Sequence, residues 1–248
     1  MESTFLVGLS QQVASHRAME VIANNIANLA TPGYKREAVQ FEEYVVEVEA
    51  TVEEGGGTIP VSLVLDRGVV RDLSDGRMES TGAALDVAIS GPGYFVVQTP
   101  DGERYTRDGH FKLDDTGRLV TVEGHPVQGA GGDIVVPPQG GELHFAEDGT
   151  ISTNLALVGN LRLVGFADER ALLKVGGGLY DAAGQPALDA PGARVHQGMV
   201  ERSNVEAVIE ISHMIDVMRA YQASAELTQT SEDLLQRAIE KLGTVPQS

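Results

Sequence analysis

The segment SNVEAVIEISHMIDVMRAYQASAELTQTSEDLLQRAIEKLG, residues 203–243, carries the longest regular pattern in the chain. Ser203 and Glu206 match a capping box, in which a Ser and a Glu three residues later satisfy the first free N–H groups of a helix. Neither Pro nor Gly follows until Gly243, and Gly is the residue type that most often ends helices. We therefore predict one long α-helix in the C-terminal part of the sequence.

Apolar residues recur along this predicted helix at alternating gaps of three and four. The ten seam positions are Ile211, Met214, Met218, Tyr221, Ala225, Thr228, Glu232, Leu235, Ile239 and Leu242. All but Thr228 and Glu232 are apolar, so the stripe persists over more than four heptads. A stripe this long and narrow is typical of packing against another long helix rather than against a small core.

The N-terminal part of the sequence supplies such a helix. Met19, Ile22, Ile26 and Leu29 show the same alternation of gaps, and Pro32-Gly33 is expected to end the helix. The two seams therefore predict a coiled-coil-like pairing of segments from opposite ends of the sequence.

The middle of the chain, residues 60–197, has a strand pattern. Asp75, Asp101, Asp108 and Asp148 are each followed by Gly, the dipeptide that favours tight hairpin turns, and short β-branched or aromatic runs lie between them. A helical period never takes over, which excludes a βαβ nucleotide-binding fold and favours a sandwich or an open barrel. Residues 47–60 are rich in Glu and Gly and are interpreted as a flexible or solvated connector.

These patterns predict an α+β fold in which helices and strands are segregated. Long N- and C-terminal helices are expected to form a coiled-coil-like domain, with a central all-β domain inserted between them. The expected boundaries are residues 1–59 for the first helix and its extended connector, 60–200 for the β-rich outer domain, and 201–248 for the helix that completes the helical domain.

Composition narrows the choice of partners. Lys plus Arg number 18 against 36 for Asp plus Glu, so the net charge of −18 disfavours binding to nucleic acid or to anionic membrane surfaces. Absence of Cys rules out disulfides and thiolate metal sites. Because no run of 18 apolar residues occurs and the first residues, MESTFLVGLSQQ, lack a basic segment, we expect neither membrane insertion nor a cleaved secretory signal.

No catalytic, cofactor-binding or metal-binding motif is present. The six His form no H-E-x-x-H pattern, Ser90 lacks the G-x-S-x-G turn, and the Gly-rich loops lack the Lys of a P-loop. We therefore expect a protein that is not an enzyme and needs no cofactor. Two alternatives stay open: a β-sandwich carbohydrate-active enzyme using Glu103, Asp108 or Asp114 as paired carboxylates, and a monomeric binding module.

One segment is more specific than any periodicity. Residues 23–35, ANNIANLATPGYK, closely resemble the N-terminal signature of the flagellar rod and hook family. Residues 91–129 resemble the central β-domain of the family, through the runs GPGYF, YTRDGHF and DDTGRLV. Residues 197–205, with Arg219-Ala220-Tyr221, resemble the C-terminal signature, although Glu206-Ala207 stands where the family usually has Asn-Pro.

The resemblance implies a structural subunit of the bacterial flagellar basal-body rod, in its periplasmic span. Such subunits polymerise through their terminal helices into the tubular drive shaft, which transmits torque and encloses the export channel. The implied partners are other copies, neighbouring rod proteins and, in transit, the flagellar type III export apparatus. A proximal rod subunit is favoured, and a distal rod subunit of the same family is the alternative.

The two seams and the Asn cluster of the N-terminal motif together give the expected assembly interface. Its residues are Met19, Ile22, Asn24, Asn25, Ile26, Asn28, Leu29, Ile211, Met214, Met218, Tyr221, Ala225, Leu235, Ile239 and Leu242. Buried Asn side chains can fix the register of packed helices, and we hypothesise that Asn24, Asn25 and Asn28 do so between subunits. The alternative is an ordinary polar helix face.

Overall fold

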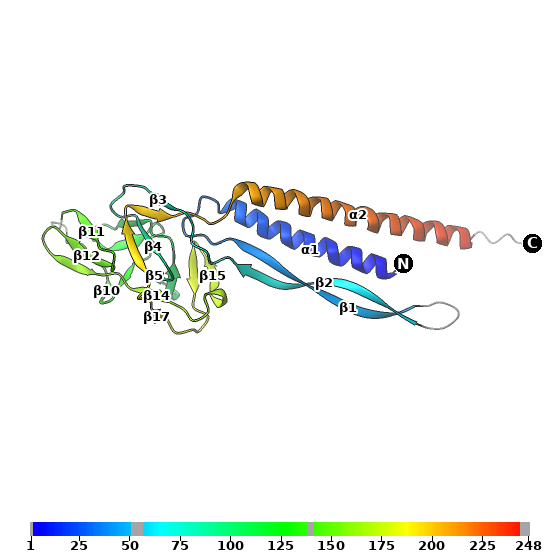
Figure 1. Ribbon diagram of the computed structural model, residues 1–248, viewed down its shortest axis with the longest axis horizontal. Coiled ribbons are helices and arrows are strands. Elements are labelled where there is room, and N and C mark those ends of the chain that lie inside the picture. The colour runs from blue at the N-terminus through cyan, green and yellow to red at the C-terminus, as the bar shows by residue number, and fades with distance from the viewer. Residues whose placement is uncertain (1, 51–56, 138–140, 244–248) are drawn as a thin grey trace, which may run out of the picture. The chain divides into compact units, whose positions relative to one another are not determined.

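The computed structural model describes residues 2–50, 57–137 and 141–243 (Figure 1). The chain divides into two compact units. The terminal unit comprises Met1–Ile26, Glu37–Val70 and Glu206–Ser248, and the central unit comprises Ala27–Arg36 and Arg71–Val205.

Two long helices dominate the terminal unit. Helix α1 (Glu2–Ala27) and helix α2 (Ala207–Gly243) lie side by side and antiparallel (Figure 1). The Ser224 hydroxyl of α2 donates a hydrogen bond to the Gly8 carbonyl of α1 at 2.8 Å. The predicted pairing of N-terminal and C-terminal helices is therefore present within a single chain.

The start of α2 differs from the predicted capping box. The helix begins at Ala207, and the Ser203 hydroxyl accepts from the Val205 N–H at 3.3 Å rather than from the Glu206 N–H. The reason lies in the neighbouring residue. The Asn204 side chain is bonded to other segments of the central unit, which holds residues 203–205 outside the helix.

A β-hairpin completes the terminal unit, and the sequence reasoning missed it. Strand β1 (Glu37–Ala50) pairs with strand β2 (Gly57–Arg71) in a two-stranded sheet. The Arg67 guanidinium is paired with the Glu42 carboxylate, and the Ser62 hydroxyl donates to Glu43 at 2.7 Å across the ribbon. The predicted flexible or solvated connector over residues 47–60 is therefore wrong for 47–50 and 57–60, which are strand. Residues 51–56 lie outside the described residues.

The predicted fold class needs correction for the same reason. We expected an α+β fold in which the long terminal helices form a coiled-coil-like domain, whereas the described residues form two α-helices, at the termini, and about 40% strand in several sheets. Part of that strand content, the β1–β2 hairpin, belongs to the same unit as the helices. What agrees with the prediction is a central β domain between two terminal helices.

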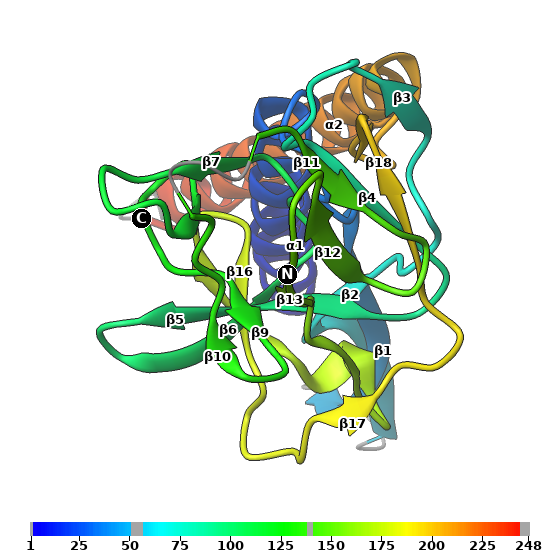
Figure 2. The ribbon, with the colours of Figure 1, turned by 90° about the vertical axis from the view of Figure 1, so that its left-hand side faces the viewer.

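The central unit is built from short strands and one 3-10 turn, η1 (Glu169–Ala171), in its described residues (Figure 2). The strands are β3 (Met78–Ser80), β4 (Val87–Ser90), β5 (Tyr94–Thr99), β6 (Gly102–Thr106), β7 (Phe111–Leu113), β8 (Leu119–Thr121), β9 (Gln128–Gly129), β10 (Gly132–Asp133), β11 (Leu143–Phe145), β12 (Thr150–Thr153), β13 (Leu157–Asn160), β14 (Leu163–Gly165), β15 (Leu173–Gly176), β16 (Leu179–Asp181), β17 (Leu188–Asp189), β18 (Arg194–Gln197) and β19 (Met199–Glu201).

The largest sheet of this unit has six strands in the order β15-β16-β6-β5-β14-β17. Smaller sheets pair β18 with β4, β19 with β3, β7 with β8 and β10 with β9, and join β11, β12 and β13. The Asp101-Gly102 turn joins β5 to β6 with Gly102 at φ +112°, so the hairpin predicted at this Asp-Gly pair is confirmed.

Strand β5 organises the interior of the central unit because both of its faces are buried. Phe95 and Val97 pack into a large apolar cluster with Phe111, Leu119 and other strand residues. Tyr94 and Val96 point to the opposite face, into a second cluster that includes three further aromatic rings, those of Tyr105, Phe166 and Tyr180. The central unit therefore has a substantial apolar core of its own.

Candidate assembly surfaces and the motif cluster

Apolar side chains are distributed very differently in the two units. Among the described residues, the terminal unit contributes four of 32 buried apolar side chains, namely Ala14, Val21, Ile22 and Val61. The same unit contributes 18 of the 26 large apolar side chains that are exposed. Exposed apolar side chains mark a site of association where they adjoin one another.

The buried seam of α2 is offset from the predicted one. Nine buried or half-buried positions of the helix form this seam: Glu210, Met214, Val217, Tyr221, Ser224, Thr228, Ser231, Leu235 and Ala238. These nine residues also follow one another at alternating gaps of four and three. Their side chains are smaller and more polar than those of the predicted seam. At Gly8 of α1 the packing is close: an added Cβ would lie 2.6 Å from the hydroxyl of Thr228, and Ser224 is the next neighbour, so small residues of α2 meet the helix there.

Several predicted interface residues of α2 therefore lie outside this seam. Ile211, Met218 and Ile239 are 50%, 44% and 68% exposed. Met214, Tyr221, Ala225 and Leu235 are half-buried. Leu242 lies within α2, and its side chain is outside the described residues.

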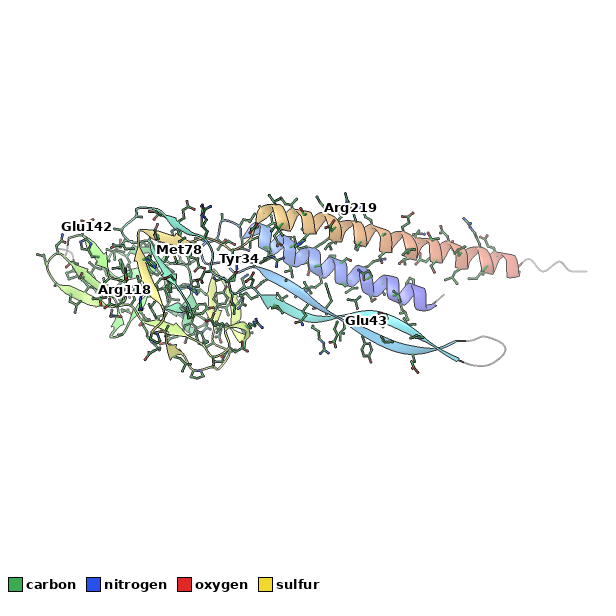
Figure 3. The ribbon with its side chains drawn as sticks, viewed as in Figure 1. Tyr34, Glu43, Met78, Arg118, Glu142 and Arg219 are labelled. Carbon is green, nitrogen blue, oxygen red and sulfur yellow. The ribbon has the colours of Figure 1, made fainter. Side chains whose placement is uncertain are left out.

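An outward apolar stripe runs along the first half of α2. Val208, Ile211, Ile215 and Met218 follow one another at gaps of three, four and three and are 78%, 50%, 40% and 44% exposed. This spacing places them on one helix face, away from the seam with α1. Other side chains of α2, such as Arg219, also project away from α1 (Figure 3).

A groove of about 670 Å³ lies between α1 and β2. Its apolar lining comes from Leu6, Leu9, Val13 and Ala14 on the helix and from Leu63 and Val64 on the strand. At its rim the Arg17 guanidinium lies 3.2 Å from the Glu20 carboxylate and 3.5 Å from that of Asp66. Since these charges pair within the chain, an apolar surface can approach the groove without meeting an unpaired charge.

The remaining predicted interface residues lie on or just after α1. Ile22 is buried, whereas Met19, Ile26 and Leu29 are half-buried. Asn24 is exposed, and Asn28 accepts a hydrogen bond from the Thr31 hydroxyl at 3.1 Å where the helix ends.

Asn25 has partners within its own chain. Its side chain is 1% exposed. The Oδ1 atom accepts from the Glu37 N–H at 3.0 Å, and Nδ2 donates to the Glu37 carbonyl at 2.7 Å and to the Glu210 carboxylate at 3.0 Å. Asn25 therefore joins α1 to the start of β1 and to α2 within one chain, and a role between subunits stays a prediction for Asn24, Asn25 and Asn28.

A cluster of buried charges in the central unit brings three sequence motifs together. The side chains of Lys35, Arg107 and Glu201 are 2%, 3% and 0% exposed. Lys35 Nζ donates to Glu201 Oε1 at 2.7 Å, and Arg107 Nη1 lies 3.6 Å from Glu201 Oε2. The Gly76 N–H donates to the same Oε1 atom at 2.8 Å. We call Lys35, Arg107 and Glu201 the motif cluster.

Gly33 shows why the N-terminal motif needs a glycine beside this cluster. Its φ is +64°, and an added Cβ would lie 2.6 Å from the Arg107 Cβ. Its N–H donates to the Glu201 carbonyl at 2.8 Å. The motif segments TPGYK, YTR and ERSNV are therefore packed on one another. Sequence reasoning missed this cluster, although charged residues inside otherwise structural motifs were a signal for it.

The carboxylates considered for an enzyme are each engaged locally. Glu103 is paired with Arg162 at 2.7 Å, and Asp108 contacts the ring of His110 at 3.0 Å. A hydrogen bond from the Thr116 hydroxyl, together with bonds from Arg118, holds the pKa of Asp114 well below its usual range. These contacts fit turn and surface roles rather than a pair of converging catalytic groups.

The described part of the chain offers neither a metal cluster nor a membrane-spanning helix. No group of three or more His, Asp or Glu side chains there is arranged to hold a metal ion. Neither of its helices is long and apolar enough to cross a membrane.

Three family models match the chain, in the order in which their regions occur. Residues 5–35 match the flagella basal body rod protein model, residues 88–153 match the D1 domain of the flagellar hook protein FlgE/F/G, and residues 196–241 match the C-terminal region of the flagellar basal body rod FlgEFG proteins. Together with the fold, these matches define the class as structural subunits of the flagellar rod and hook.

Curated relatives narrow this class. The chain is 39% identical to the flagellar basal-body rod protein FlgF of Caulobacter vibrioides, over 99% of this chain and 100% of that relative. It is 37% identical to the flagellar basal-body rod protein FlgG of Buchnera aphidicola subsp. Acyrthosiphon pisum, over 88% and 92% of the two chains. It is 34% identical to the FlgF protein of Mesorhizobium japonicum, over 98% and 99%. The chain belongs to the flagellar basal-body rod protein family.

Membership in this family settles four of the sequence predictions. The chain is a structural rod subunit and not an enzyme, since its relatives are structural proteins. Its place is the flagellar basal body, where it associates with copies of itself and with other rod proteins.

Proposed function

We propose that this rod subunit polymerises through its terminal unit, and that α1 and α2 form part of the wall of a tube that transmits torque and encloses the export channel. The observation that carries the proposal is the contrast between four buried and 18 exposed apolar side chains in this unit. Burying one large apolar side chain contributes roughly 1.5–3 kcal/mol, so neighbouring subunits can supply the stability that the isolated unit lacks.

Two surfaces are proposed as the main contacts. One is the outward stripe of α2, Val208, Ile211, Ile215 and Met218, which includes two residues predicted from the sequence. The other is the groove between α1 and β2. The predicted residues Met19, Ile22, Asn25 and Ile26 support these surfaces from within, because they are buried or half-buried in the chain itself.

A position in the proximal rod is proposed over the distal one. Matches to FlgF proteins cover 98–99% of this chain at 34–39% identity, whereas a match to an FlgG protein at 37% covers 88%. Full-length coverage favours an FlgF-type subunit, and the distal type is the alternative. From the family resemblance alone, we also propose passage through the flagellar type III export apparatus.

The test replaces two residues of the stripe by charge, in the variant I211E/I215E. The matched control is L155E/L157E, which changes two leucines of the central unit that are 76% and 72% exposed. In cells that lack the native gene, we expect the stripe variant to abolish incorporation into purified basal bodies, and the control to incorporate normally.

A fold check accompanies this test. Thermal unfolding of the central unit should be unchanged in the stripe variant, because the substituted residues lie in the terminal unit. Normal incorporation of I211E/I215E would show that the stripe is not an assembly surface.

A further inference from the structure

The chain crosses between its two units four times, after residues 26, 36, 70 and 205. Segments next to three of these crossings lie together inside the central unit. They are residues 34–36, 71–76 and 201–205, which we call the three crossing segments. These crossings are the covalent links between the two units, so force can pass from one unit to the other through them.

One side chain bonds to the other two crossing segments at once. Asn204 Oδ1 accepts from the Arg36 N–H at 2.6 Å. Asn204 Nδ2 donates to the Asp72 carbonyl at 3.0 Å and to the Ser74 carbonyl at 3.1 Å. An amide can do this because it carries an acceptor and two donors on one small planar group.

Backbone bonds close the arrangement around Asn204. The Asp72 N–H donates to the Arg36 carbonyl at 2.8 Å, and the Asn204 N–H donates to the Tyr34 carbonyl at 3.3 Å. Each crossing segment is therefore bonded directly to the other two.

A second layer links the same segments more deeply in the unit. Lys35 Nζ donates both to Glu201 and to the Ser74 carbonyl, each at 2.7 Å. The Gly76 N–H donates to Glu201 at 2.8 Å. Each of the three crossing segments contributes to this layer, through Lys35, Ser74–Gly76 and Glu201. The buried ion pair therefore joins the same segments that Asn204 joins nearer the surface.

We propose that Asn204 is the positioning residue of a clamp that holds the three crossing segments as one junction, so that force between the units is shared among them. Hydrogen bonds that join several strands open together rather than singly, which raises the cost of local opening. The force-sharing role of the clamp rests on the proposed function as a torque-transmitting rod subunit. The hydrogen bonds that form the clamp do not depend on that function.

Hydrogen exchange on the full chain tests the clamp with two variants and a control. N204A removes both the acceptor and the donors of the side chain. N204D keeps an acceptor for the Arg36 N–H but loses the donors to Asp72 and Ser74. N160A is the control, since Asn160 donates to Thr150 elsewhere in the central unit.

We expect N204A to speed amide exchange at Arg36 and Asp72 at least tenfold, with strand β5 unchanged. N204D should keep Arg36 protected, because the new carboxylate still accepts from the Arg36 N–H, and should speed exchange at Asp72, whose segment loses the bonds from Asn204 to its carbonyls. N160A should change neither amide. Unchanged exchange in N204A would overturn the clamp. Equal acceleration in β5 would also overturn it, because Asn204 would then serve only general stability.

Motility under load tests the sharing of force. Cells carrying N204A should build rods in normal number but lose at least twofold more swimming speed than wild type when the medium is made viscous. An equal loss, or an absence of rods in these cells, would overturn the force-sharing role. Failure of the wild-type chain to enter rods would instead contradict the proposed function. The hydrogen-exchange result would remain valid in that case, because it does not depend on assembly.

Discussion

Glu201 is a carboxylate with no solvent exposure, and its charge is balanced by Lys35 at 2.7 Å and by Arg107 at 3.6 Å. Burying charge is costly, so such a pair stabilises little relative to apolar residues, but removing one partner leaves an uncompensated charge. The position of the motif cluster explains why the family motifs contain charged residues in the interior of the protein.

Replacing the buried lysine is therefore expected to be severe. K35M should destabilise the central unit by about 3–5 kcal/mol, because the buried Glu201 side chain would lose its nearest cation and the hydrogen bond from Lys35. Denaturant unfolding followed through the tyrosines of the core gives the measurement. K112M, at an exposed lysine, should stay within about 0.5 kcal/mol of wild type. A similar small effect for K35M would show that the ion pair of Lys35 and Glu201 contributes little to the stability of the central unit.

Asp114 gives a pH prediction at the same scale. Its pKa is lowered, first by the Thr116 hydroxyl and then by bonds from Arg118, so the folded state binds this proton less tightly than the unfolded state. Its contribution to stability is therefore complete above the unfolded pKa of about 3.9 and is lost as the pH falls toward the folded value. An NMR titration of the Asp114 carboxyl carbon should show a midpoint below the usual Asp pKa of about 3.9. The T116V substitution should raise that midpoint, because it removes the hydroxyl that donates to Asp114. A midpoint near 4 in the wild type would contradict the turn geometry.

At the scale of elements, the packing of α1 against α2 depends on small residues. A Cβ built at Gly8 would lie 2.6 Å from Thr228 Oγ1, and that hydroxyl already donates to the Ser224 carbonyl and accepts from Gln12. The two helices can approach this closely only because Gly8 has no side chain.

The substitution G8A should therefore destabilise the protein, although a change from Gly to Ala inside a helix usually stabilises it. Alanine in place of glycine inside a helix normally stabilises by about 0.5–1 kcal/mol, but here the added methyl group should cost about 1–3 kcal/mol through overpacking. Rod incorporation and motility halos should fall with G8A and recover in G8A/T228A, which removes the blocking atom. The single variant T228A is the control and should assemble. Unimpaired assembly of G8A would mean that the helices pack differently in the rod.

The whole molecule combines a well-packed central unit with a terminal unit that has few buried apolar residues. Segments that cannot bury enough apolar surface are marginally stable alone and gain order from neighbours. The two units should therefore differ in stability in the free subunit.

Limited proteolysis of the unassembled chain should reveal that difference. Trypsin is expected to cut first in the terminal unit, for example at Arg17, Arg219 and Arg237, and to leave a resistant fragment close to residues 71–205. Mass spectrometry identifies the fragments, and purified rods provide the control in which the same sites should be protected. Equal resistance of both units in the free chain would show that the helices and the hairpin are stable without neighbours.

The sequence by itself determined the two terminal helices, the strand-rich middle and the family. These depend on local signals: heptad spacing in residues 211–242, Asp-Gly turns, and the uninterrupted motif at 23–35. The β1 strand could also have been predicted, because Phe41, Tyr44 and Val45 have high strand propensity. The Glu- and Gly-rich composition that follows it favoured a connector instead.

Only the tertiary structure decided which face of α2 meets α1 and what the motif residues do. The seam is set by Gly8 on the partner helix, which periodicity along α2 alone cannot reveal. Lys35 and Glu201 are 166 residues apart in sequence, and Asn204 bonds to Arg36 across 168. Contacts at such separations depend on how the whole chain folds back on itself, so a local sequence pattern cannot predict them.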